Sequence, residues 1–323
     1  MKRFYKGIAL ACGLLAFGAV GVTGARAADY PSKPIHLIVG YAPGGAVDIV
    51  SRILAKHLSQ RLGQNVVVEN RPGGGTLIAL TTLAKAEPDG YTMMMADIAM
   101  GAAPALHKKL PYDTFKDFKP VVLCALLPGV MAVDKKLPVK NVGDLVKLAK
   151  KEPGKLNYAS SGIGSLGHLG PELFKAESGT DIVQIPYHSG AQATQALLAG
   201  TVQMMMGTAP PILPHKNQVH ILAISHDKRL AIMPDVPTFA EQGYPGVKVQ
   251  LWEGLFVPRG TDPAVIKKIN AAVNEVLKNP EVDERISKLG GAVVGGTPEH
   301  LEGFLKQEVA KWLKVVPASL RAK

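Results

Sequence analysis

The sequence predicts an α/β protein with two lobes, each a mostly parallel sheet flanked by helices. Short β-rich segments alternate with amphipathic helical segments, and short connections join them. This alternation runs to about residue 130 and then starts again. Both halves contain a glycine-rich turn that opens a helix and a methionine triplet near the end of a strand. We therefore expect two similar lobes instead of a solenoid of short repeats.

The first half predicts strands at 35–41, 65–70 and 91–97. A helix starting at Ala46 separates the first two strands, and its apolar residues recur on one face: Val47, Val50, Leu54, Leu58 and Leu62. Strand, helix, strand with short connections is the βαβ unit of a parallel sheet.

The second half repeats this order. Helices are expected at 142–152, 164–179 and 191–200, and strands at 155–160, 181–187 and 202–208. The chain closes with helices at 265–279 and 300–316, the second with Thr297 as N-cap and Pro298 at its first position.

The N-terminus has the three parts of a secretory signal peptide. Lys2, Arg3 and Lys6 precede an apolar run at 7–22, and the small residues Ala25 and Ala27 suit a signal peptidase, so we expect residues 1–27 to be cleaved. Removing 27 of the 323 residues leaves 296, enough for two domains. The expected product is a soluble, exported, periplasmic protein.

The charge of the chain limits the expected partners, and its cysteine content indicates a core without disulfides. Cleavage removes four positive charges and no acid, which lowers the formal net charge from +11 to +7. These charges are dispersed, so nucleic acid is not an expected partner, although the positive field favours anionic ligands. Cys124 alone remains after cleavage, within an apolar strand, and is expected to be a core residue.

The segment YASSGIGSLGH (158–168) raises the question of ligand type. Gly162, Gly164 and Gly167 have the spacing of a dinucleotide-binding loop, but that site also needs an acid at the end of the next strand. That strand ends instead in Tyr187 and His188. Free backbone amides at a helix start also bind a carboxylate, and three hydroxyls are available to help: Ser160, Ser161 and Ser165. The alternative is a sharp turn whose serine caps the helix.

The segment GYAPGGAVD (40–48) is the matching element of the other lobe. It lies between a strand and a helix and contributes candidate ligand-binding residues: Tyr41, Pro43, Gly44, Gly45 and Asp48. The alternative role of Asp48 is helix capping, since it falls in the first turn. Both loops follow the carboxyl ends of strands, where open parallel sheets bind ligands, and facing loops would hold an acid.

Three more residues are candidates beside the cleft. His168 is either a neutral donor to an anion or an ordinary partly buried histidine. Asp97 and Thr208 follow the methionine triplets, which we expect to pack in the core and not to bind metal. Asp97 would either repel a carboxylate or accept a hydrogen bond from an amino group, and the sequence leaves both open.

The sequence gives little indication of catalysis or of a bound cofactor. Ile163 stands where a G-x-S-x-G nucleophile elbow needs glycine, and no acid is evident to orient a Ser165–His168 pair. An exported serine hydrolase is therefore a remote alternative, and no metal or cofactor is expected.

Seven segments together resemble the receptors of tripartite tricarboxylate transporters, the Bug proteins: GYAPGGAVDIVSRILA, VVVENRPGGG, LPYDTFKDFKPV, LNYASSGIGSLGHLGPELF, IPYHSGAQATQALLAGTVQMMM, RLAIMPDVPTFAEQGYPG and WEGLFVPRGTDP. The resemblance covers essentially the whole mature chain. It implies a type II periplasmic binding protein that closes like a flytrap, with lobe 1 at 28–128 plus 248–323 and lobe 2 at 129–247.

The resemblance also implies the partners. A monomeric receptor would bind a di- or tricarboxylate or an aromatic acid through the two loops named above, and deliver it to membrane transporter subunits. A membrane sensor is the alternative partner. The sequence departs from the pattern of the family it resembles at Asp97, at Gly207-Thr208, in PYHSGAQATQALL and in GGGTLIAL, all around the expected pocket. These departures concern the identity of the ligand.

Overall fold

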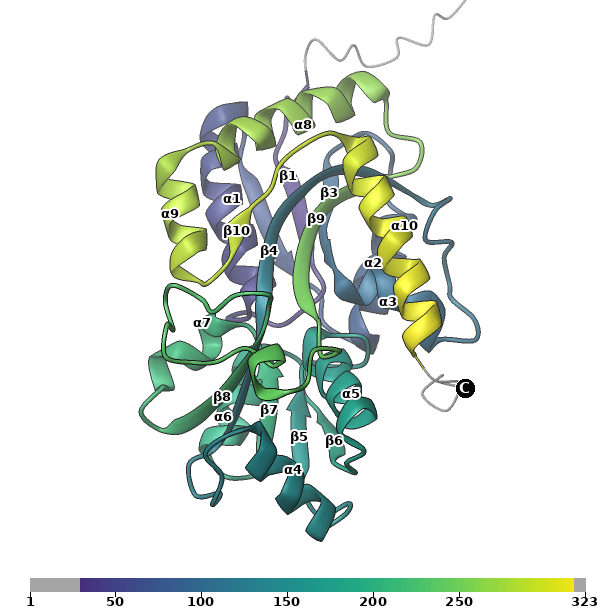
Figure 1. Ribbon diagram of the computed structural model, residues 1–323. Helices are drawn as coiled ribbons and strands as arrows, with labels where there is room; N and C mark the ends of the chain where they lie inside the picture. Colours follow the sequence, from purple (N-terminus) through teal and green to yellow (C-terminus); the bar gives the residue numbers. More distant parts are fainter. Residues whose placement is uncertain (1–29, 317–323) are drawn as a thin grey trace, which may run out of the picture.

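The computed structural model describes residues 30–316, so the predicted signal peptide lies outside the described residues. Two lobes stack on one another, and the long strand β4 (Phe118–Asp134) runs through both (Figure 1). The strands form one continuous order, β2-β1-β3-β9-β4-β7-β5-β6, with β8 and β10 also paired to β4. Within 30–316, no helix combines the length and apolar character needed to cross a membrane.

The first lobe begins with the expected parallel strands: β1 (Ile35–Val39), β2 (Val66–Asn70) and β3 (Thr92–Asp97). Antiparallel strands complete its sheet: β9 (Gln250–Pro258), part of β4 and β10 (Ala292–Val293). Its helices are α1 (Ala46–Leu62), α2 (Leu77–Ala84), α3 (Ile98–Leu106), α8 (Pro263–Leu277), α9 (Pro280–Lys288) and α10 (Pro298–Val315).

The second lobe has parallel strands β5 (Asn157–Ser160), β6 (Val183–Pro186) and β7 (Met204–Gly207), while β8 (Val219–Ser225) runs antiparallel to β4. Its helices are α4 (Val142–Lys151), α5 (Leu166–Ser178), α6 (Gly190–Leu198) and the single turn α7 (Ala209–Ile212). The prediction of a two-lobed α/β fold is confirmed. The strand around Cys124 in β4 was expected, but β8, β9 and β10 were not, and neither was the antiparallel pairing of these four strands, because an apolar run does not encode the direction of its neighbour.

Local sequence signals fix several helix ends. α1 ends at Gly63, whose φ of 69° is the left-handed conformation that glycine adopts without strain, and its N–H donates to Ser59 O. Thr297 caps α10 as predicted, since its hydroxyl accepts a hydrogen bond from His300 N–H. The predicted core positions are also confirmed, because Cys124 and both methionine triplets are almost fully buried.

Candidate functional site

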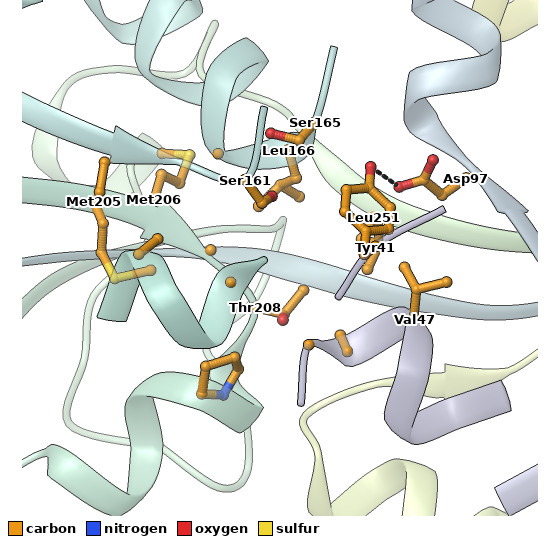
Figure 2. Close-up of a pocket in the computed structure, with 18 residues that line it drawn as sticks. Tyr41, Val47, Asp97, Ser161, Ser165, Leu166, Met205, Met206, Thr208 and Leu251 are labelled. Atoms are coloured by element: carbon orange, nitrogen blue, oxygen red, sulfur yellow. Dashed lines mark hydrogen bonds between the residues drawn. The ribbon is translucent and has the colours of Figure 1, made fainter. Parts of the chain in front are cut away.

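A cavity lies between the two lobes at the carboxyl ends of the parallel strands (Figure 2). It holds about 540 Å³ of atom-free space, part of which is open to solvent. The first lobe contributes Tyr41, Gly45, Ala46, Val47, Asp97 and Leu251. The second lobe contributes Ala159, Ser161, Ser165, Leu166, Gly167, Gly190, Ala193, Met205, Met206, Gly207, Thr208 and Pro211.

The start of α1 presents free backbone amides to this cavity. Its N-cap, Gly45, has extended φ and ψ of −83° and 170° and provides no side-chain cap. Within the described part of the chain, the amides of Gly45, Ala46 and Val47 meet no hydrogen-bond acceptor. Unpaired N–H groups and the positive end of the helix dipole together favour an anion here.

The carboxylate of Asp48 stabilises the conformation of this turn. Its carboxylate accepts hydrogen bonds from Gly44 N–H at 3.0 Å, Asn70 Nδ2 at 2.8 Å and Arg52 Nε at 3.0 Å. Burial acts to raise the pKa of Asp48, but these hydrogen bonds outweigh it and leave the pKa below its usual value. Asp48 is thus a positioning residue and does not line the cavity. Gly44 has φ of +89°, so the turn requires glycine there.

The start of α5 provides a second set of amides. The N-cap Ser165 makes no side-chain cap and instead donates its hydroxyl to Gly162 O at 2.7 Å. Leu166 and Gly167 line the cavity, and among residues 30–316 their N–H groups meet no acceptor. A third helix, α6, begins at the cavity wall with Gly190. Three helix starts therefore converge on one space.

The remaining residues of the glycine-serine loop shape it without lining the cavity. Ser160 Oγ accepts from Gln184 Nε2 at 2.7 Å and from Gly162 N–H at 3.3 Å. His168 is 4% exposed, and its Nδ1 accepts from Gly164 N–H at 3.2 Å. Acceptance at Nδ1 requires a neutral ring, and burial lowers the pKa of His168 to about 4 although Glu172 opposes the shift.

We expect His168 to make the protein sensitive to acid. Protonation is favoured in the unfolded state below the usual pKa of 6.5 and in the folded state only below about 4, so stability is lost as pH falls through this window. His168→Asn keeps an acceptor near Nδ1 and removes the titration, whereas His168→Leu leaves the buried Gly164 N–H unpaired and should cost about 1–3 kcal/mol. Denaturant titrations at several pH values measure both effects. If the wild type and His168→Asn lost stability equally on acidification, this role would be wrong.

Asp97 and Tyr41 form the polar end of the cavity. The Tyr41 hydroxyl donates to Asp97 Oδ2 at 2.7 Å (Figure 2), and Ala99 N–H donates to Oδ1 at 3.2 Å. Burial raises the pKa of Asp97 to about 7, against the lowering effect of these two hydrogen bonds. Thr208 also lines the cavity, and its side chain does not cap the short helix that follows.

The two lobes touch around the cavity, so this structure is a closed arrangement. Ala42 N–H donates to His188 O at 3.2 Å across the gap. A Cβ added to Gly45 would lie 3.7 Å from Gly190 N, and one added to Gly75 would overlap the carbonyl oxygen of Ile163. Glycine at these positions allows the backbones of the two lobes to approach closely.

The structure divides the predicted site residues into two groups. Six line the cavity: Tyr41, Gly45, Asp97, Ser161, Ser165 and Thr208. Seven lie behind it or beside it: Pro43, Gly44, Asp48, Ser160, Gly162, Gly164 and His168. The sequence-based prediction included the amides at both helix starts but did not name the residues that carry them, Ala46, Val47, Leu166 and Gly167, although the rule that a helix start has unpaired N–H groups points to them. It also missed Met205 and Met206, which are buried and yet form part of the wall.

The structure does not bring Ser165 and His168 together in the way that the serine hydrolase alternative requires. Ser165 Oγ donates to Gly162 O and His168 Nδ1 accepts from Gly164, so the structure does not join the two as a nucleophile and its base. Lysine, arginine and histidine are absent from the cavity wall that residues 30–316 form. The same residues contain no group of three or more histidine, cysteine, aspartate or glutamate side chains placed to hold a metal ion.

Known relatives share this architecture. Residues 50–319 match the family described as "Tripartite tricarboxylate transporter family receptor". The chain is 36% identical over 303 residues to BugT of Bordetella pertussis, which spans 92% of each protein. It resembles the solved structures of Rhodopseudomonas palustris Rpa4515 with adipate (TM-score 0.86, 32% identity, covering 89% of this chain and 97% of that one) and MatC with bound malate (TM-score 0.86, 33% identity, covering 89% and 100%). The chain therefore belongs to the tripartite tricarboxylate transporter receptor family, the Bug-type periplasmic binding proteins.

Proposed function

We propose that this protein captures a small organic acid between its lobes, with the acid's carboxylate held by backbone amides. The observation that carries the proposal is the convergence of three helix starts on one cavity whose described wall has no cationic side chain. The relatives solved with adipate and malate support a carboxylate ligand.

The route of the ligand is the second part of the proposal. The protein would act in the periplasm as a monomer after cleavage at residue 27, and would pass its ligand to the membrane subunits of a tripartite transporter. Family membership and the signal-peptide pattern support this role. A chemical transformation of the ligand is not part of the proposal.

Closure of the lobes is the third part. We place the lobe division as the sequence suggests, with 28–128 plus 248–323 in one lobe and 129–247 in the other. In support, β4 pairs with β9 up to Pro128 and with β8 from Gly129, and Gly129 N–H donates to Val249 O at 3.4 Å. The two points at which the chain passes from one lobe to the other therefore lie side by side, as a hinge between the lobes requires.

Calorimetry on the mature protein tests the proposal. Malate, adipate, an aromatic acid such as benzoate and the corresponding neutral amides are titrated in the presence of a chelator. We expect at least one acid to bind without metal while its amide does not, because free N–H groups need an anionic acceptor. Binding that appears only after a divalent metal is added would contradict the amide mechanism.

A further inference from the structure

Asp97 gives the cavity a negative end. Within the described wall it is the one carboxyl side chain, and it is 2% exposed. Its two partners, the Tyr41 hydroxyl and the Ala99 N–H, both donate to it. The surroundings therefore present Asp97 as a hydrogen-bond acceptor and leave its remaining lone pairs for a ligand.

Asp97 and Glu253 form a buried pair of acids, and the surroundings of Glu253 indicate which of the two carries the negative charge. It lies directly opposite Asp97 in the β3–β9 pairing and is 0% exposed. Neither of its carboxyl oxygens has a hydrogen-bond partner in the described structure. Burial, followed by the charge of Asp97, raises the pKa of Glu253 well above its usual value. Glu253 is thus the neutral member, and the donors around Asp97 favour the negative charge there.

A buried carboxylate without a cation is costly. The described wall offers no basic side chain, and the compensation present is the Tyr41 hydroxyl and the start of α3, which Asp97 caps. A cationic group on the ligand would add the full charge that these donors lack. Asp97 and Tyr41 lie at one end of the cavity, Met205 and Met206 at the other, and Ser161 between them (Figure 2). The wall therefore has an acceptor end, an anion-binding middle and an apolar end.

We propose that the ligand is an amino acid with an apolar side chain. Its carboxylate would meet the helix starts, its ammonium group would donate to Asp97, and its side chain would point toward Met205 and Met206. This inference rests on the proposed function, and it selects one substrate class within it. A dicarboxylate would bring a second negative charge to Asp97 and would need a proton there.

Matched pairs of acids test this assignment in the wild-type protein. Valine, leucine and phenylalanine are compared by calorimetry at about pH 7.5 with 3-methylbutanoate, 4-methylpentanoate and 3-phenylpropanoate, which lack only the amino group. Malate and adipate are titrated beside them. We expect at least one amino acid to bind on the order of tenfold or more tightly than its partner acid and than either dicarboxylate.

Asp97→Asn gives the complementary result, because it keeps a carbonyl acceptor for the Tyr41 hydroxyl and removes the charge. The amino acid should lose on the order of tenfold in affinity, the acid without an amino group should change little, and a dicarboxylate should gain. Asp227→Asn, on an exposed side chain paired with Lys248, is the control and should change none of these affinities.

The outcomes separate the two proposals. If malate or adipate binds more tightly than every amino acid, or Asp97→Asn strengthens binding of all the acids alike, the amino acid assignment is wrong while the carboxylate receptor stands. If none of the eight acids binds, this inference fails, and the proposed function fails with it if benzoate does not bind either. The wild-type comparison decides the case even if the Asp97 variant does not fold.

Discussion

Gly45→Val is expected to reduce the affinity for the bound acid by on the order of 100-fold, equivalent to roughly 2.7 kcal/mol. Gly45 lines the cavity at the start of α1, and a Cβ there would lie 3.7 Å from Gly190 N. One methyl group fits this space as ordinary contact, but the two branches of valine would cover the free amides. Gly45→Ala should therefore have a smaller effect than Gly45→Val.

The fold should survive this change. Gly45 has extended backbone angles that valine also adopts, and replacing glycine by valine at an N-cap costs about 1 kcal/mol. Thermal unfolding measures this cost separately from calorimetric affinity. Gly303→Val is the control, because nothing lies within 4 Å of a Cβ added there. Equal affinities of the wild type and Gly45→Val would remove the start of α1 from the binding site.

Gly75→Ala is expected to weaken binding by a comparable factor through a different cause, which is closure of the lobes. In the closed arrangement a Cβ at Gly75 would overlap Ile163 O and lie 3.1 Å from the Ile163 carbonyl carbon. This clash exists only while the lobes touch, so it penalises the closed state and leaves the open state alone. Small-angle scattering with saturating ligand should show a larger radius of gyration than for the wild type.

Backbone strain needs its own control, since Gly75 has φ of +60° and alanine disfavours this conformation whether the lobes are open or closed. Gly63→Ala has a similar φ of +69° with nothing within 4 Å of the added Cβ. It should lower stability and leave affinity unchanged. If the two variants reduced affinity alike, closure at Gly75 would not be the cause.

The sequence predicted the fold class and the two loops better than it predicted which atoms face the cavity. Periodicity located α1 and α5, and their glycine-rich starts indicated an anion site. Asp48 and His168 were predicted to bind the ligand because they are polar residues at the two helix starts. In the structure both side chains accept hydrogen bonds from the backbone of their own loops and hold it in shape. The choice between facing the cavity and supporting the loop depends on side-chain rotamers and hydrogen-bond partners, which a linear pattern does not contain.

The pairing of strands that are distant in the sequence determines the other residues of the site. Met205 and Met206 form a cavity wall only because β7 lies between β4 and β5, and Glu253 meets Asp97 only because β9 runs antiparallel beside β3. Uniformly apolar segments such as β4 do not encode the direction of their neighbours. The helix that starts at Gly190 was predicted at 191–200, but its place at the cavity was missed for a similar reason, since no glycine-rich motif precedes it.

The crystal structure of the mature protein with its bound acid, grown without divalent metal, tests the central claim most directly. The account predicts carboxylate oxygens within hydrogen-bonding distance of the amides at the starts of α1 and α5, among them Ala46, Val47, Leu166 and Gly167. A ligand held mainly by lysine or arginine side chains, or located away from these helix starts, would contradict it.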